Sequence, residues 1–144
     1  MSLRFHEISE SRHRILNPLS AAKLELLGEI CADGRPITIL DLCCGKAEML
    51  CQWATKHPVT GIGVDISEVF IAAARRRVAE LGLEDRISLV YSDAVQYLEQ
   101  PKAGRDEQFD VVACIGATWL PPGSGVAPRS EATCAAALGR SVDA

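Results

Sequence analysis

Apolar positions along the chain follow two alternating patterns. Short stretches that are apolar at nearly every position have the length of buried strands, and they lie at residues 37–42, 59–66, 87–91 and 109–115. Between these stretches, apolar residues recur every three or four positions, which predicts helices over residues 49–54, 67–82 and 94–98. Uniformly apolar strands that alternate with helices are typical of a parallel sheet covered on both faces. The pattern therefore predicts an α/β fold, a doubly wound Rossmann-like parallel sheet.

The two ends of the chain differ from this central part. Residues 3–16 are polar and predict a short helix or an arm, and a helix is expected to follow, with Asn17 as its cap, Pro18 in its first turn and Gly34 at its end. Residues 121–144 contain three prolines, three glycines and six alanines and lack aromatic residues. We therefore expect a domain over residues 1–119 and an irregular tail over residues 120–144.

Charge and composition restrict the class of partner. The formal net charge of −4 argues against general binding to nucleic acid or to anionic membranes, since both reward a basic surface. The sequence has neither an apolar stretch long enough to span a membrane nor the apolar core of a signal peptide, so we expect a cytoplasmic protein. The six cysteines form no Cys-x-x-Cys pair and no zinc-like spacing with histidine. They are expected to be buried thiols, and no metal site is predicted.

The chemically interesting residues follow the predicted strands. Ligands of parallel α/β sheets bind beyond the carboxyl ends of the strands, where in this sequence three acidic residues and two turns of small residues come together. The acidic residues are Asp41, Asp65 and Asp93, and the turns are 43–47 and 116–118. A turn of small residues admits a ligand close to the backbone, and a carboxylate accepts hydrogen bonds from ribose hydroxyls or from an adenine amine. An adenosine joined to a small zwitterionic group would use all of these features.

Four segments resemble the motifs of class I S-adenosylmethionine-dependent methyltransferases. Residues 39–47 (ILDLCCGKA) resemble the D-x-G-x-G-x-G motif, and residues 63–67 (GVDIS) resemble the second motif. Residues 91–94 (YSDA) are similar to the segment that contacts adenine, and residues 109–112 (FDVV) to the start of the fourth strand. The resemblance covers residues 17–119 in order and spacing. Residues 5–18 also resemble small-molecule methyltransferases that have a helical lid, which implies a lid over residues 1–34.

The resemblance implies a role for each matching residue. Asp41, Gly45 and the backbone near Cys43 would face the methionine part of S-adenosylmethionine. Asp65 would hold the ribose, and Ile66 would pack on the adenine. The edge of the adenine would be read by Asp93 and the N–H of Ala94, and Gly116 would follow the fourth strand at the same edge of the sheet. The implied reaction is methyl transfer to a small-molecule acceptor, and the resemblance identifies no catalytic base.

The family also implies a strand order and a longer sheet. The four strands would lie in the order 3-2-1-4, and three further strands would complete the sheet on the C-terminal side. We therefore expect an incomplete sheet and a chain that ends early, through truncation or a shifted reading frame. Cys43 and Ala47 stand where the motif has its first and third glycines. Either residue is strained if its position requires a positive φ.

Two other functions are alternatives to methyl transfer. A nicotinamide-dependent oxidoreductase also uses a glycine-rich turn and a ribose aspartate, but residues 43–48 do not fit its G-x-G-x-x-G fingerprint. A non-catalytic fragment or binding module stays open, as does the oligomeric state. His6 and His13 are candidate bases only if the N-terminal arm closes over the site.

Several other residues have structural interpretations. Asp110 is expected to be structural, and Trp53 and Phe70 have the spacing of core residues. Lys46, Glu48 and the arginine run 75–77 are expected to be solvated.

Overall fold

The structure of the chain, a computed structural model, describes residues 3–17, 19–100 and 108–115. The predicted tail, Pro18 and Gly116 lie outside the described residues. In chain order the elements are α1 (Leu3–Ser9), α2 (Ala21–Ala32), β1 (Ile37–Leu42), α3 (Glu48–Lys56), β2 (Val59–Asp65), α4 (Glu68–Glu80), β3 (Ile87–Tyr91), α5 (Ala94–Glu99) and β4 (Val111–Ala113).

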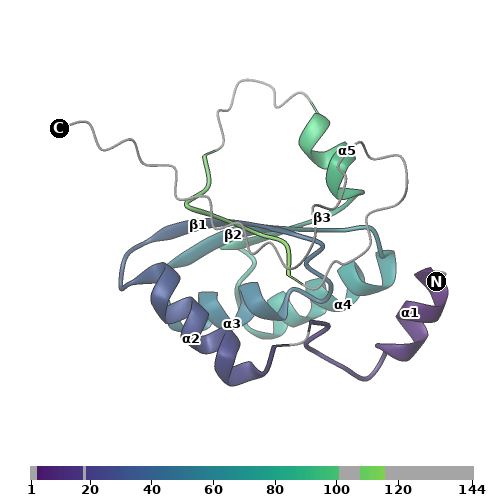
Figure 1. The fold of residues 1–144 in the computed structure, drawn as a ribbon, viewed down its shortest axis with the longest axis horizontal. Coiled ribbons are helices and arrows are strands. Elements are labelled where there is room, and N and C mark those ends of the chain that lie inside the picture. The colour runs from purple at the N-terminus through teal and green to yellow at the C-terminus, as the bar shows by residue number, and fades with distance from the viewer. Residues whose placement is uncertain (1–2, 18, 101–107, 116–144) are drawn as a thin grey trace, which may run out of the picture.

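The strands form one parallel sheet in the order β3-β2-β1-β4, which confirms the predicted order. Helices α2, α3 and α4 lie on one face of the sheet, and α5 lies on the other (Figure 1). Because all four strands run in the same direction, their carboxyl ends meet at one edge of the sheet. The described sheet therefore has the doubly wound α/β architecture that the alternating pattern predicts.

The core lies between the sheet and the layer formed by α2, α3 and α4. Ile39 of β1, Leu50 of α3 and Ile71 of α4 are almost completely buried, and each such side chain contributes roughly 1.5–3 kcal/mol. Trp53 is 3 % exposed and donates its indole N–H to the Leu24 carbonyl of α2 at 2.6 Å. Trp53 is thus a core residue, as the sequence predicted, and its indole N–H is hydrogen bonded inside the protein.

Gly28 of α2 allows this packing. A Cβ at Gly28 would lie 2.7 Å from Cδ1 of Trp53, closer than real Cβ atoms come to a neighbour. Any other residue at this position would push α2 away from α3. The position of α2 on the sheet therefore depends on the absence of a side chain at Gly28.

Element boundaries agree with the sequence pattern in some places and not in others. The predicted ends of β1 and β3 are confirmed, as is the capping role of Ser67, whose hydroxyl accepts from the Phe70 N–H at 3.2 Å. The predicted start of α2 is wrong, because Ser20 caps the helix and Asn17 instead accepts from the Leu19 N–H at 3.0 Å. The fourth strand is also shorter than predicted, since only three of its residues pair with β1.

The charged residues of α3 and α4 correct a second prediction. Glu48 is only 8 % exposed, and its carboxylate accepts from Nε of Arg77 at 3.3 Å. Arg75 and Arg76 are exposed as expected. The prediction that Glu48 and Arg77 are solvated is wrong. The periodicity of one segment cannot show that a second helix faces it. Among the described residues, no helix is both long enough and apolar enough to cross a membrane.

Candidate functional site

The turn between β1 and α3 has an unusual backbone. Cys43, Gly45 and Ala47 have φ of 60°, 56° and 55°, in the left-handed region that glycine adopts most easily. A non-glycine residue there costs of the order of 1–2 kcal/mol. Cys43 and Ala47 occupy the two motif positions that lack glycine, so the strain expected from the sequence is present at both. The turn keeps its shape because other contacts hold it.

Gly45 carries the contacts that hold the turn. Its N–H donates to Oδ2 of Asp65 at 2.8 Å, and the neighbouring Cys44 N–H donates to the Val64 carbonyl at 2.9 Å. A Cβ at Gly45 would lie 2.7 Å from Cδ1 of Leu16, which belongs to the segment after α1. Gly45 is therefore enclosed between the end of β2 and the N-terminal part of the chain.

Asp65 ends β2 and is 8 % exposed. Its second oxygen, Oδ1, accepts from the Ser67 N–H at 2.8 Å. Burial raises the pKa of Asp65, and the hydrogen bonds from Ser67 and Gly45 oppose this rise. Each carboxylate oxygen has two acceptor positions, so Asp65 can accept further hydrogen bonds from a bound ligand.

Asp41 lies in β1, one strand away from Asp65, and is 4 % exposed. Burial raises its pKa well above the ordinary value, and the nearby Cys114 and Asp65 raise it further. Within the part of the chain that the structure describes, no lysine, arginine or histidine forms an ion pair with it. A cationic ligand group beside Asp41 would offset the cost of ionising it.

Two cysteines meet at this edge of the sheet. Cys43 follows β1 and Cys114 follows β4, and their thiols are hydrogen bonded to each other. The bond from Cys43 lowers the pKa of Cys114 to about 7, although burial opposes this shift. The sequence indicated Cys43 as a site residue but not Cys114. The strand order was the only available signal, because it makes β1 and β4 neighbours.

Asp93 lies after β3, next to the end of β2. The Ser92 N–H donates to the Asp65 carbonyl at 3.0 Å, which links these two strand ends. Oδ1 of Asp93 accepts from the N–H groups of Val95 and Gln96 at 2.9 and 3.1 Å, so Asp93 caps α5. Ala94 is the first residue of that helix, and Ile66 follows β2 with 47 % of its surface exposed. The structure thus brings the described site residues to one edge of the sheet.

Lys46 and α1 also belong to this edge. The resemblance implied an N-terminal lid, but the sequence did not predict the contacts of Lys46. Nζ of Lys46 donates to backbone carbonyls in the segment after α1, and Glu7 of α1 accepts from the Ser67 hydroxyl at 2.6 Å. Lys46 was expected to be solvated, and this prediction is wrong. Its partners lie more than 30 positions earlier in the chain, beyond the range of any local pattern. His6 packs edge-on against Phe70, whereas His13 pairs with Glu10 at an exposed site.

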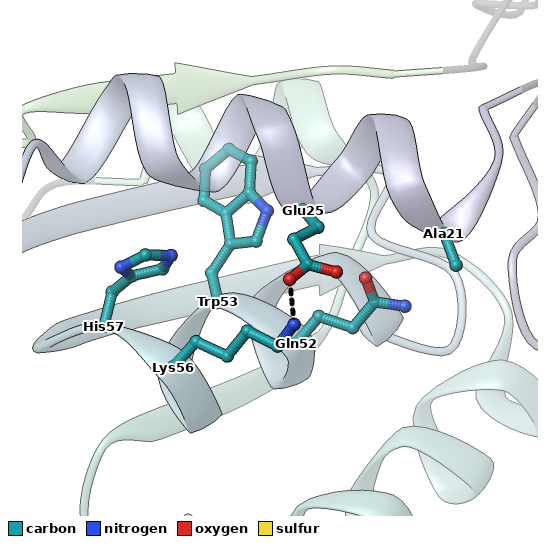
Figure 2. Close-up of a pocket in the computed structure, with 6 residues that line it drawn as sticks. All are labelled: Ala21, Glu25, Gln52, Trp53, Lys56 and His57. Atoms are coloured by element: carbon teal, nitrogen blue, oxygen red, sulfur yellow. Dashed lines mark hydrogen bonds and ion pairs between the residues drawn. The ribbon is translucent and has the colours of Figure 1, made fainter.

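A cavity of ≈ 200 Å³ lies elsewhere, between α2 and α3 (Figure 2). It is lined by Ala21, Glu25, Gln52, Trp53, Lys56 and His57. His57 precedes β2, so this end of the cavity lies at the amino edge of the sheet, opposite to the aspartates. Glu25 and Lys56 form an ion pair there. The cavity therefore shares no residue with the site described above.

The chain is similar to known methyltransferases. A family model described as a methyltransferase domain matches residues 39–127. The uncharacterized protein YjhP of Escherichia coli (strain K12) is 43 % identical over 120 residues, which are 83 % of this chain and 46 % of that protein. The 27-O-demethylrifamycin SV methyltransferase of Amycolatopsis mediterranei is 35 % identical over 74 residues, 51 % of this chain and 25 % of that enzyme.

A solved methyltransferase structure is also similar to this chain. It is a SAM-dependent methyltransferase from Thiobacillus denitrificans in complex with S-adenosyl-L-homocysteine, 39 % identical, with a TM-score of 0.71 over 83 % of this chain and 45 % of that one. The chain spans less than half the length of each of these three relatives. The family model nevertheless matches more than half of the chain, and the strand order is the one that its motifs imply. The chain therefore belongs to the class I S-adenosylmethionine-dependent methyltransferases.

Proposed function

We propose that this chain binds S-adenosylmethionine at the carboxyl edge of its sheet and serves methyl transfer to a small-molecule acceptor. One observation carries the proposal. The ends of β1, β2 and β3 bring Asp41, Asp65 and Asp93 to one edge, and the turn after β1 is hydrogen bonded to Asp65. An adenosine ligand needs hydrogen-bond acceptors in that arrangement.

The described residues fit this ligand. Asp65 has acceptor positions left for two ribose hydroxyls, and Ile66 offers an exposed apolar surface to the adenine. Asp93 and the Ala94 N–H would read the adenine edge. The buried carboxyl of Asp41 would face the amino group of the methionine part, beside the backbone of Cys43 and Gly45. Gly116, which lies outside the described residues, would follow β4 at the same edge.

The chemistry places modest demands on the protein. The cofactor supplies an electrophilic methyl group on a sulfonium, so the residues of the site have to align the methyl donor with its acceptor and exclude water. The turn at residues 43–47 and Asp65 would fix the donor, since each is held by the other. The arm that includes α1 would cover the site. No residue is assigned as a general base.

Two observations support a small acceptor in preference to a nucleic acid. The net charge is −4, and a nucleic-acid substrate rewards a basic surface. The relative from Amycolatopsis mediterranei is named for a small-molecule substrate, 27-O-demethylrifamycin SV. The proposal includes a cytoplasmic location, in keeping with a soluble metabolic enzyme.

Thermal unfolding with different ligands tests the binding part. S-adenosylhomocysteine at a hundredfold excess over its Kd should stabilise the chain by about 2.7 kcal/mol, whereas NAD and NADP should leave the melting temperature unchanged. Stabilisation by NAD alone would favour an oxidoreductase and contradict the proposal. Transfer of a labelled methyl group tests the activity, with small hydroxyl or amine compounds in one set of reactions and RNA in another. Labelling of RNA alone would refute a small acceptor.

A further inference from the structure

The side chain of Lys46 extends from the turn at residues 43–47 to the segment after α1. Its Nζ donates to the carbonyls of Glu10 and Ser11 at 2.7 and 3.1 Å, and to the carbonyl of His13 at 2.5 Å. An ammonium group has three donors, and all three are used here. The three carbonyls belong to the segment directly after α1, beyond the last residue of the helix. Lys46 therefore fixes this segment beside the turn at residues 43–47.

This arrangement is costly for a lysine. Burial lowers the pKa of Lys46, although the charge of Glu10 opposes the shift. Fixing a long side chain in one geometry costs up to about 2 kcal/mol of conformational entropy. A lysine that served solubility alone would extend into water and avoid both costs. The three carbonyl bonds and the Phe70 ring, 5.8 Å from Nζ, stabilise the bound position.

The rest of the arm contacts the same site. The arm is defined as residues 3–16. Its Glu7 accepts from the Ser67 hydroxyl at 2.6 Å, its His6 packs edge-on on Phe70 with 5.5 Å between ring centres, and its Leu16 lies against Gly45. The arm therefore touches the two segments that are proposed to hold the methionine and ribose parts of the cofactor. Figure 1 shows α1 beside α4, apart from the sheet.

We propose that Lys46 is a positioning residue that couples the arm to the cofactor, so that each orders the other and the arm forms a wall of the methyl-transfer site. The coupling rests on the proposed function, since it needs a ligand in the turn. A ligand that orders residues 43–47 also fixes the start of the Lys46 side chain, and an ordered arm fixes its end. Ordering of one partner thus lowers the entropy cost of ordering the other, and the effect is reciprocal.

Lys46→Met tests the coupling, because methionine keeps the length of the side chain but removes the donors. Lys56→Met is the matched control, since Lys56 pairs with Glu25 at the amino edge. Trypsin cleavage after Arg12 and Arg14, both exposed in the arm, reports on the order of the arm. Without ligand, cleavage should be about tenfold faster in K46M than in the wild type and unchanged in K56M. This measurement does not depend on cofactor binding, and equal rates in all three proteins would overturn the inference.

The second measurement is S-adenosylhomocysteine binding by calorimetry. K46M should bind about five- to fiftyfold more weakly, in line with typical coupling between sites, and the ligand should protect the arm from trypsin in the wild type but not in K46M. Lys46→Arg keeps donors for the carbonyls and should restore part of both effects. Normal affinity and normal protection in K46M would overturn the coupling. A wild type that binds no S-adenosylhomocysteine would refute the proposed function, and the coupling with it. A thermal melt of each variant confirms that it folds.

Discussion

The two edges of the sheet differ in whether their charged side chains have partners. At the amino edge, Oδ2 of Asp110 accepts from the N–H and the hydroxyl of Thr38 at 2.8 and 3.1 Å. Nη2 of Arg86 donates to the Val59 carbonyl at 2.8 Å there. At the carboxyl edge, Asp41 is buried without a described cation, and the charge of Asp65 raises its pKa further. The backbone of the turn after β1 is left-handed at two non-glycine residues.

The difference supports the proposal that the carboxyl edge binds a ligand, whereas the amino edge contributes to stability. Polar groups at the amino edge satisfy one another, so they contribute to the fold as it stands. The carboxyl edge carries unfavourable terms that a bound cation and bound hydroxyls would reduce, and such strain is typical of functional sites. Substitutions at the two edges should therefore separate ligand affinity from stability.

The largest effect is expected from Asp65→Ala compared with Asp110→Ala. Loss of two charge-assisted hydrogen bonds to ribose, each worth roughly 1.5–3 kcal/mol, should weaken S-adenosylhomocysteine binding about a hundredfold or more. D110A should lower stability by about 1–3 kcal/mol and leave affinity unchanged. Calorimetry and urea unfolding measure the two quantities. Since D65A also frees the N–H groups of Gly45 and Ser67, Asp65→Asn serves as a milder comparison. Equal affinity in D65A and D110A would remove Asp65 from the site.

The next effect concerns recognition of the adenine by Asp93. If its carboxylate accepts from the adenine amine, Asp93→Ala should reduce the preference for S-adenosylhomocysteine over its inosine analogue by about tenfold, within the 1–3 kcal/mol of one hydrogen bond. Competition binding with both ligands measures the preference. Since Asp93 caps α5, the variant should also lose about 1 kcal/mol of stability. A loss of stability with the full preference retained would make Asp93 a helix cap only.

Asp41→Asn should change stability in a pH-dependent way. Because burial raises the pKa of Asp41 in the folded state, the stability that goes with its protonated form is lost as pH rises through that raised pKa. D41N avoids this loss, so its melting temperature should exceed that of the wild type by a few degrees at pH 8. The gap should close in acid, where both side chains are neutral. S-adenosylhomocysteine should bind D41N more weakly. A constant gap between pH 5 and 8 would contradict the assignment of the cost to Asp41.

The smallest effect concerns the thiol pair. With a pKa of about 7, Cys114 should react with iodoacetamide half-maximally near pH 7, and faster as pH rises. Cys43→Ala removes the hydrogen bond that lowers this pKa, so the midpoint should move up by about one unit or more, toward the ordinary thiol value. Peptide mass spectrometry follows alkylation at Cys114, and the buried Cys51 serves as an internal reference. An unchanged midpoint in C43A would show that the two thiols act independently.

Local sequence determined most of the fold. The apolar stretches at residues 37–42 and 87–91 became strands with the predicted ends, because a segment that is apolar at nearly every position needs cover on both faces of a sheet. The position of Asp65 at a strand end and of Ser67 at a helix start also followed from neighbouring residues. Asp41, Asp65 and Asp93 were predicted at one edge because parallel strands end together.

Only the tertiary structure decided how the edge is held together. The bonds from Lys46 to the arm, from Gly45 to Asp65 and between Cys43 and Cys114 join residues between 20 and 71 positions apart. Strand order brings these residues together, and no local period encodes which side chain will face which carbonyl. The start of α2 also depends on tertiary contacts. Asn17 and Ser20 are both good caps, and Ser20 caps the helix, whose Leu24 carbonyl accepts from the indole N–H of Trp53. Propensity thus specified the elements, whereas packing specified their partners.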